Sequence, residues 1–310
     1  MHFRRSASLP LPAAFAAVLA AAIFTVPLLA AELVQGVRSK LSAADLSSGE
    51  AAVEAYRLAK GVDPEYLSAV GWLARGAEML GKREKAADWV AELRREIRAE
   101  APETIVPLGA AIEVEGRLRL AAEGRGGSIR FLEGELARAK DPALRSRIRK
   151  SLNVLTLEGE AAPELGGEET LSGPRFRLAD LAGRPALLFF WANWCSDCKA
   201  ESAKLGRLRE KYAPKGLVLA APTRLYGSVE GNKDAPAAEE MAHARRIFSE
   251  AYPGLAGVSV PVDTETMVRY GASATPTYVL VDKRGRVSLY APTRVSEAEL
   301  ARRIEALLAE

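Results

Sequence analysis

The chain has few cysteines and histidines, the residues that form structural zinc sites. Its 310 residues include two cysteines and two histidines, and aromatic residues make up 6%. A structural zinc site needs four cysteine or histidine ligands, and the chain offers no more than Cys195, Cys198, His2 and His243. Zinc is therefore the weaker explanation of the cysteine pair, and we expect no metal site.

Several functional motifs are also missing. No Gly-rich phosphate loop, His-Glu-x-x-His motif or Gly-x-Ser-x-Gly turn stands out, so we expect no bound cofactor. The formal net charge is +3, which gives no sign of nucleic-acid binding.

The two cysteines that are present lie three residues apart, as Cys195 and Cys198. The apolar run 185–191 before them has the length of a strand that is buried on both faces. The segment 199–212 after them has a helical spacing of apolar residues. The pair is therefore expected at a strand-to-helix junction.

This position favours redox chemistry. Cys195 is expected just ahead of the helix, where free backbone N–H groups and the helix dipole stabilise an anion, so its thiolate should form readily. Cys198, one turn later, is placed to resolve a mixed disulfide. A purely structural disulfide is the alternative, but a bridge that closes so small a loop restricts the unfolded chain little.

Residues 1–31 have the pattern of an export signal. Two arginines precede an Ala-rich apolar run, and no acidic residue occurs before Glu32. The run is long for a signal peptide, so an uncleaved membrane anchor within residues 9–31 is the alternative. Both place the rest of the chain in the periplasm or another extracytoplasmic compartment, where a thiol pair depends on an exported or membrane-bound thiol-disulfide electron donor.

The chain length suggests two domains, of which the first, at 32–157, has helical spacing throughout. Its clearest unit is a helical hairpin from Asp63 to Arg98, which loosely resembles a tetratricopeptide unit. Further helices are expected at 105–122, 128–139 and 141–155, with Gly124-Arg125-Gly126-Gly127 separating the first two. We predict an all-α helical-hairpin domain that binds a protein partner.

The end of this domain is locally basic, with six lysines or arginines between Arg138 and Lys150. Such a run indicates either an acidic partner or anionic lipid, or a solvated helix face, which is the commoner case.

Residues 158–173 have no helical or strand period, so we predict a linker there. The second domain, at 174–310, alternates strands with helices and closes with a hairpin, which predicts a mixed α/β sheet with helices on both faces. Strands are expected at 175–178, 185–191, 217–221, 258–262, 277–281 and 286–290, and helices at 199–212, within 223–252, at 264–270 and at 296–308.

From about residue 161 to the end, the chain resembles the thioredoxin-like fold, and more closely its exported TlpA/ResA branch of thiol-disulfide oxidoreductases. The matching segments are 176–183 (FRLADLAG), 190–195 (FWANWC), 198–201 (CKAE), 260–263 (VPVD) and 270–277 (YGASATPT). The resemblance implies an α/β thioredoxin-like C-terminal domain after the all-α domain, on which it is silent.

The resemblance also implies roles for single residues. In such proteins the first cysteine attacks the substrate disulfide and the second releases the product, which gives Cys195 and Cys198 these roles. Pro276 aligns with the family's cis-proline, which faces the cysteines and leaves the preceding backbone free to pair with a bound peptide. Thr275 would then lie beside the sulfurs, and Trp194 would cover the disulfide and contact the partner.

Glu201 matches an acidic residue near the active site of the ResA-like members. A carboxyl group there could accept and return a proton during exchange, particularly if partial burial raised its pKa. The alternative is an exposed first-turn glutamate that stabilises the helix dipole.

Ser196 and Asp197 differ from the Gly-Pro of thioredoxin and from the x-Pro common in the TlpA/ResA branch. The missing proline and the negative charge near Cys195 disfavour its thiolate, and therefore the reduced form. We predict a protein that reduces its partners rather than oxidising them.

The leading prediction is an exported thiol-disulfide oxidoreductase that reduces disulfide-bearing proteins, with the helical domain choosing or holding the partner. A peroxiredoxin-like thiol peroxidase is an alternative because the two families share this fold, although Ala192 stands where those enzymes place a threonine. A redox-gated helical scaffold or adaptor is the other alternative.

Overall fold

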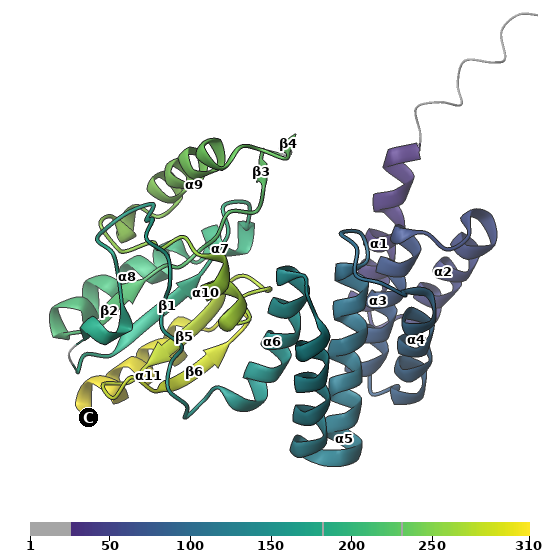
Figure 1. Ribbon diagram of the computed structural model, residues 1–310, viewed down its shortest axis with the longest axis horizontal. Helices are drawn as coiled ribbons and strands as arrows, with labels where there is room; N and C mark the ends of the chain where they lie inside the picture. The colour runs from purple at the N-terminus through teal and green to yellow at the C-terminus, as the bar shows by residue number, and fades with distance from the viewer. Residues whose placement is uncertain (1–25, 182, 231) are drawn as a thin grey trace, which may run out of the picture.

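The computed structural model describes residues 26–310 apart from 182 and 231. Figure 1 shows a helical half, residues 26–157, beside a half built around a β-sheet, residues 158–310. Most of the predicted export signal or anchor, 1–31, lies outside the described residues. Within the part described, none of the helices has both the length and the hydropathy that crossing a membrane requires.

The helical half confirms the expected all-α architecture. Each helix packs against the next one along the chain. The helices are α1 (Val26–Ser42), α2 (Leu46–Lys60), α3 (Pro64–Met79), α4 (Arg83–Glu96), α5 (Ile105–Arg138) and α6 (Pro142–Thr156).

The predicted hairpin at 63–98 is formed by α3 and α4. The Asp63 carboxylate accepts a hydrogen bond from the Tyr66 amide at 2.8 Å, and Pro64 occupies the first turn, where its missing N–H costs nothing. Gly81 follows the end of α3 with φ of +73°, a left-handed conformation that glycine adopts without strain.

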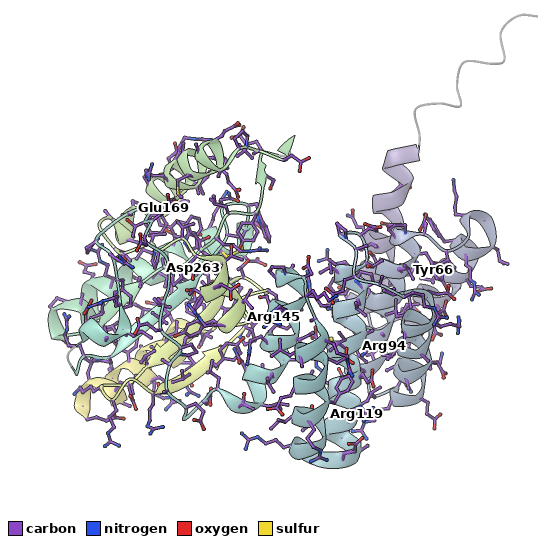
Figure 2. All side chains as sticks on the ribbon, viewed as in Figure 1. Tyr66, Arg94, Arg119, Arg145, Glu169 and Asp263 are labelled. Carbon is purple, nitrogen blue, oxygen red and sulfur yellow. A yellow bond between two sulfur atoms is a disulfide. The ribbon has the colours of Figure 1, made fainter. Side chains whose placement is uncertain are left out.

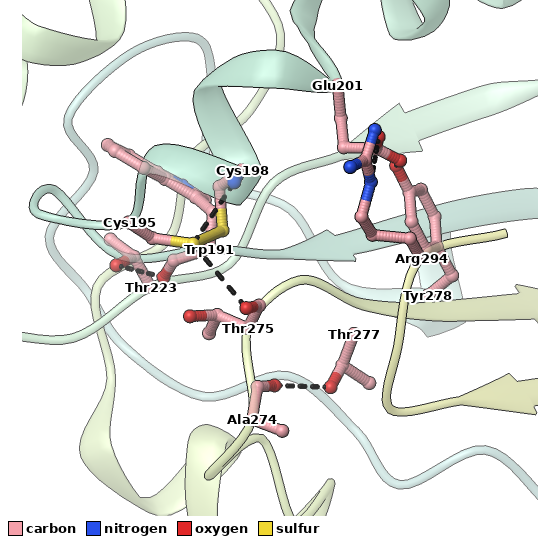
Figure 3. The surroundings of a disulfide bond; sticks show 10 residues. All are labelled: Trp191, Cys195, Cys198, Glu201, Thr223, Ala274, Thr275, Thr277, Tyr278 and Arg294. Carbon is pink, nitrogen blue, oxygen red and sulfur yellow. Dashed lines mark hydrogen bonds and ion pairs between the residues drawn. A yellow bond between two sulfur atoms is a disulfide. The ribbon is translucent and has the colours of Figure 1, made fainter. Parts of the chain in front are cut away.

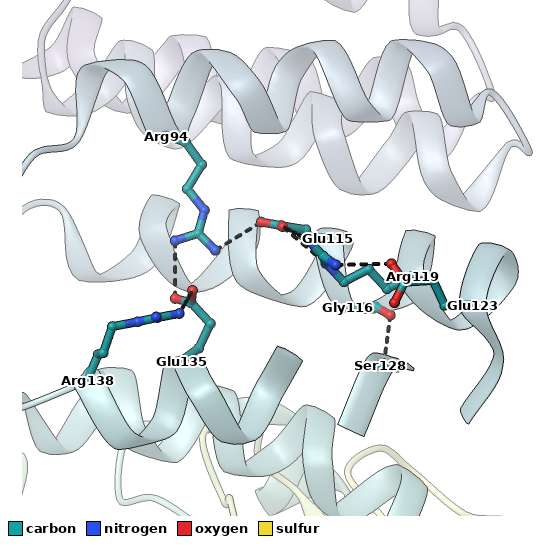
Figure 4. A network of polar contacts seen from close by, with 8 residues as sticks. All are labelled: Arg94, Glu115, Gly116, Arg119, Glu123, Ser128, Glu135 and Arg138. Carbon is teal, nitrogen blue, oxygen red and sulfur yellow. Dashed lines mark hydrogen bonds and ion pairs between the residues drawn. The ribbon is translucent and has the colours of Figure 1, made fainter. Parts of the chain in front are cut away.

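Helix α5 is two helices folded back on each other at Gly124, within the predicted break 124–127, of which residues 125–127 are helical. Gly124 has φ of 73° and ψ of −176°, far from helical values. Ser128 Oγ then donates to the Gly116 carbonyl at 2.8 Å, which joins the two arms. Figure 4 shows Glu115 and Arg119 on one arm and Glu135 on the other, with Arg94 of α4 bonded to both glutamates.

The sheet half has the expected mixed α/β fold. Its strand order is β2-β1-β5-β6, with β1 parallel to β2 and antiparallel to β5, and β5 antiparallel to β6. The strands are β1 (Ala186–Phe190), β2 (Val218–Ala220), β5 (Thr277–Val281) and β6 (Val287–Ala291), with a separate small hairpin of β3 (Ser228–Val229) and β4 (Asn232–Lys233). The helices are α7 (Ser196–Ala200), α8 (Ser202–Tyr212), α9 (Ala237–Ala251), α10 (Thr264–Arg269) and α11 (Glu297–Ala309).

Strand β1 is buried on both faces, as its uninterrupted apolar sequence predicts. Leu187 and Phe189 join the core formed with α8, α9 and α11. Leu188 and Phe190 point to the other face, into the core that includes Met267 of α10. The central strand is thereby held in place, and with it the cysteines that follow.

Two predicted strands differ from the structure. The strand expected at 175–178 was wrong: residues 178–181 form a short 3-10 helix, and Arg177 pairs with Asp180 across one turn, with nitrogen and oxygen 2.8 Å apart. The segment 258–262 makes only isolated bridges, including Ser259 to Ala220. Pro261 has no N–H to donate, so a regular ladder cannot run through it.

Residues 158–173, predicted as a linker, are attached to the sheet half. Leu165 and Leu171 are buried, and the Leu171 amide donates to the Val260 carbonyl at 2.9 Å. The Gly159 amide donates to the Val287 carbonyl at 2.8 Å. The segment is therefore not a free tether, and the domain boundaries themselves stay a prediction.

The two halves meet where α6 packs against α10, a contact that we call the junction. Ser146 Oγ donates to the Met267 carbonyl at 3.3 Å, and Asn153 Nδ2 donates to the Arg269 carbonyl at 3.0 Å. Gly271 lies so close to α6 that an added Cβ would be 2.4 Å from the Lys150 nitrogen. The junction thus reaches the loop that leads to Pro276.

Candidate active site

The cysteine pair lies between strand β1 and helix α7, as the sequence predicts. Cys195 caps the N-terminus of α7, and the Cys198 amide points at its Sγ from 3.1 Å. Cys195 and Cys198 form a disulfide (Figure 3). In the reduced state the same amide would donate to the Cys195 thiolate and stabilise it.

The two sulfurs differ in access. Cys195 is 4% exposed and Cys198 is fully buried. An incoming thiolate or disulfide can therefore reach Cys195 first, which fits the order of attack that the resemblance implies.

The loop before β5 faces the disulfide. The Thr275–Pro276 peptide bond is cis, as the resemblance implies, and the Thr275 carbonyl oxygen lies 3.5 Å from Cys195 Sγ. Thr277 Oγ donates to the Ala274 carbonyl at 2.7 Å, which fixes the turn from within (Figure 3). Thr275 thus lies beside the sulfurs, with its main chain nearest to them.

The two tryptophans near the cysteines have different surroundings. Trp194 is 60% exposed and meets the Tyr226 ring edge to face at 5.5 Å, while the Arg224 guanidinium lies 4.5 Å above that ring. Trp191 is buried and donates from Nε1 to the Ala221 carbonyl at 3.0 Å. Trp191 is therefore a core residue, and Trp194 is free to contact a partner.

We call Trp194, Arg224, Tyr226 and Gly227 the rim of the disulfide. Glu240 holds this rim in place, a role that the sequence analysis did not predict. Its buried carboxylate accepts from the amides of Tyr226 and Gly227, both at 2.7 Å, and from Asn193 Nδ2 at 3.3 Å. The only sequence signal was a pair of glutamates, Glu239 and Glu240, in the first turn of a helix. Nothing in that pattern tells which of the two is buried.

Glu201 lies between α7 and α8 with 2% of its surface exposed, so the exposed first-turn alternative is wrong. Its carboxylate accepts from the Tyr278 hydroxyl at 2.7 Å and from Arg294 Nε at 2.9 Å, and it pairs with Lys204. In Figure 3 the carboxylate points toward Arg294 and Tyr278 rather than toward the sulfurs.

These partners decide the charge state of Glu201. Burial raises its pKa, but the hydrogen bonds from Lys204, Tyr278 and Arg294 outweigh burial and lower it. The shift is opposite to the one that favours a proton-transfer role. That role therefore stays a prediction without the raised pKa on which the sequence argument relied.

The residues between the cysteines, Ser196 and Asp197, are exposed in the first turn of α7. Their influence on the redox potential of the pair stays a prediction. Across the residues that the structure describes, no group of three or more His, Cys, Asp or Glu side chains could hold a metal ion.

These features together define a class of domain. A Cys-x-x-Cys disulfide at the start of a helix, facing a cis-proline loop at the end of a mixed sheet, is the arrangement of a thioredoxin-like domain. The C-terminal half of the chain is such a domain.

Comparisons with known proteins agree with this class. Residues 159–289 match the family model described as AhpC/TSA family. The thioredoxin-like protein YneN of Bacillus subtilis is 29% identical over 129 residues, which covers 41% of this chain and 67% of that protein. The thiol-disulfide oxidoreductase ResA of Bacillus cereus is 29% identical over 117 residues, which covers 38% of this chain and 60% of that protein.

A solved thiol:disulfide interchange protein of the thioredoxin family from Chlorobium tepidum is also similar. It is 20% identical with a TM-score of 0.38, and the match covers 48% of this chain and 95% of that one. The match covers less than two thirds of the length of the Bacillus cereus ResA.

Proposed function

We propose that the protein is an exported thiol-disulfide oxidoreductase that reduces disulfides in other proteins. The observation that carries the proposal is the Cys195–Cys198 disulfide at the start of α7 with the Thr275 carbonyl beside it. The names of the relatives, thioredoxin-like protein and thiol-disulfide oxidoreductase, support the same reaction class.

The reaction begins from the reduced pair. The Cys195 thiolate attacks one sulfur of the substrate disulfide, whose other sulfur leaves as a thiolate, so that a mixed disulfide forms. The Cys198 thiolate then attacks Cys195 Sγ, and the second substrate sulfur leaves. Two electrons have passed to the substrate, and the pair has the oxidised form that the structure describes.

Substrate binding is proposed at the cis-proline loop. An extended segment of the substrate would pair with the backbone before Pro276, as an added strand does, which brings its disulfide to Cys195. Trp194, 60% exposed, would cover the reacting sulfurs on the other side. Glu201 would hold α7 and α8 in position and so orient the cysteine pair. A proton-transfer role for its carboxyl group stays a prediction.

Export is proposed from the apolar pattern of residues 1–31. An extracytoplasmic pair has no glutathione buffer, so a membrane or exported thiol-disulfide protein would have to return the two electrons. The helical half would hold the partner protein.

The reduction potential of the Cys195/Cys198 pair, measured against glutathione or dithiothreitol, tests the direction. The exposed Asp197 beside Cys195 supports a value nearer about −270 mV than about −120 mV, the potentials of a reductant and an oxidant of this fold. Cys195→Ser is the control that removes the couple. A value near the oxidant's would reverse the direction.

Two other results would replace the proposal. The absence of a reversible couple would favour the redox-gated scaffold. Rapid consumption of hydrogen peroxide by the reduced chain would favour the peroxidase, although Ala192 is buried and offers no hydroxyl beside the cysteine.

A further inference from the structure

The exposed apolar side chains of the protein gather on its helical half. Among the described residues, eight large hydrophobic side chains are exposed, and seven of them belong to residues 26–157. The exception is Trp194 beside the disulfide. Exposed apolar side chains that stand alone need no explanation, but those that share a hollow mark a surface that binds another molecule.

Two of these side chains, Leu120 of α5 and Val154 of α6, line one cavity of about 470 Å³, which we call the groove. Leu120 is 39% exposed and Val154 is 58% exposed. Further apolar lining residues are Leu132, Leu155 and Pro292. Figure 2 labels Arg119, the residue before Leu120, toward the lower end of α5. The groove therefore offers aliphatic surface to a second molecule.

The polar wall of the groove has an excess of positive charge. Glu113 binds Arg75 and Lys150, both at 3.1 Å, and it binds Arg117 at 2.8 Å. Arg117 also binds Glu78 at 2.8 Å. Burial raises the pKa of Glu113, but the three cations outweigh burial and bring the pKa to about 2, so Glu113 is ionised. Within the described chain this cluster thus has three cations and two carboxylates, and all but Arg75 line the groove.

Lys150 has hydrogen bonds left for a ligand. Its ammonium group can donate three, and in the part of the chain that the structure describes one of them reaches Glu113. Burial lowers the pKa of Lys150 by more than Glu113 raises it, so the ammonium group is short of negative charge. The groove therefore fits an aliphatic segment that carries one carboxylate.

Pro292 connects the groove to the redox site. It follows Ala291, which pairs with Tyr278 near the start of β5, two residues after Pro276. Two residues beyond Pro292, Arg294 Nε donates to the Glu201 carboxylate at 2.9 Å. The groove thus reaches the end of the sheet at which the loop to Pro276 and the disulfide lie.

We propose that the groove binds a segment of the protein substrate that has aliphatic side chains and one carboxylate, while the target disulfide of the same substrate lies at Cys195. This rests on the proposed reductase function and states how the helical half would hold its partner. The aliphatic side chains would cover Leu120 and Val154, and the carboxylate would bind Lys150.

The test uses the full chain, reduced beforehand, and synthetic peptides that each contain one disulfide. One peptide ends near the disulfide, and the others add a segment beyond a Gly-Ser spacer, on either side and at increasing spacer lengths. The segment combines leucines with Glu, leucines with Gln, or serines with Gln. Oxidised glutathione, which has no such segment, measures the basal reaction.

We expect the Leu-Glu segment to raise kcat/KM about tenfold over the Ser-Gln segment at the best spacer length. This corresponds to about 1.4 kcal/mol and is less than full burial of one leucine contributes. At low salt the Leu-Glu segment should exceed the Leu-Gln segment by about threefold, with the difference shrinking as salt rises.

Leu120→Ser and Val154→Ser should each remove most of the advantage of the leucine segments. Lys150→Gln should remove the difference between the Glu and Gln segments alone. Leu58→Ser, which changes an exposed leucine of α2 outside the groove, is the matched control and should leave both effects as in the wild type. Unchanged rates with oxidised glutathione, together with circular dichroism, check that the variants fold.

The outcomes separate the two proposals. Equal rates for all peptides, or a leucine advantage that persists in both Leu120→Ser and Val154→Ser, would overturn the groove assignment while leaving the reductase intact. Binding to phosphatidylglycerol vesicles that is lost in these two variants, without any peptide preference, would assign the groove to a lipid surface and overturn it as well. Reduced thiols that react with none of the disulfides would overturn the reductase function itself.

Discussion

At the scale of single residues, competition between burial and nearby charges decides whether the Glu201 carboxyl group is ionised. Burial favours the protonated carboxyl, but Lys204, Arg294 and the Tyr278 hydroxyl all stabilise the carboxylate, so the pKa is lowered. In return Glu201 raises the pKa of Tyr278, which burial has already raised. The carboxylate therefore joins α8 to β5 and to the loop before α11.

Glu201→Gln should lower the free energy of unfolding by about 1–3 kcal/mol at pH 7, because Lys204 loses a buried partner. A lowered folded-state pKa adds stability that is complete above the ordinary value of 4.5 and is lost as pH falls through the folded value. The difference in the free energy of unfolding between wild type and variant should therefore shrink as the solution becomes acidic. Urea unfolding at a series of pH values measures it.

Glu297→Gln is the matched control, since Glu297 pairs with Arg207 in solvent and should matter much less. A Glu201 variant as stable as wild type at pH 7 would show that its ion pairs are not stabilising. A slower disulfide exchange with a shifted pH profile at unchanged stability would instead support the proton-transfer role.

At the scale of elements, helix α9 places one carboxylate where it holds the rim of the disulfide. Glu240, in its first turn, is fully buried and binds the amides of Tyr226 and Gly227. Asn193, two residues before Cys195, donates to the same carboxylate. Tyr226 and Gly227 are thereby tied to the loop between β1 and α7 that carries Asn193 and Cys195.

Glu240→Gln replaces one acceptor oxygen with a donor, so one amide of the rim loses its partner. We expect a loss of about 1–2 kcal/mol in stability and faster hydrogen exchange at Tyr226 and Gly227. Glu239→Gln, the exposed neighbour in the same turn, is the control. Equal exchange rates in the two variants would mean that the carboxylate does not hold the rim.

At the scale of the whole molecule, the junction connects the helical half to the redox site through a short piece of chain. Gly271 has φ of +61° and leaves space for the backbone of α6, and Thr275 lies four residues further on, beside Cys195 Sγ. The Tyr290 hydroxyl also donates to the Tyr270 carbonyl at 2.8 Å, which fixes the start of this loop on the sheet.

Gly271→Ala should therefore disturb both the junction and the site. Its Cβ would lie 2.4 Å from the Lys150 nitrogen and 2.6 Å from Lys150 Cα, both backbone atoms, so α6 must shift. We expect a loss of about 2–4 kcal/mol, the sum of a left-handed backbone cost and an overpacking cost. Thermal unfolding and the reduction potential of the cysteine pair measure the two effects.

Gly285→Ala separates these two costs. Gly285 has φ of +78° with nothing within 4 Å of an added Cβ, so it carries the backbone cost alone. If both variants lose the same stability and keep the same potential, the junction does not couple the helical half to the site.

The sequence by itself determined the local features. The apolar run of β1, the helix after Cys198 and the turn at Gly124 follow from periodicity and from the conformational freedom of glycine, which act over a few residues. The cysteine spacing determined the redox chemistry. The predictions that failed, the strand at 175–178 and the exposed alternative for Glu201, concerned short or amphipathic segments where neighbours outweigh propensity.

Only the tertiary structure decided which polar groups meet. Glu201 faces Arg294 across 93 residues, and Asn193 faces Glu240 across 47, and no local pattern relates such positions. No local pattern predicts the close approach of α6 to Gly271 either. Burial, charge pairing and the approach of the two halves depend on distances through space, which packing sets after the elements have formed.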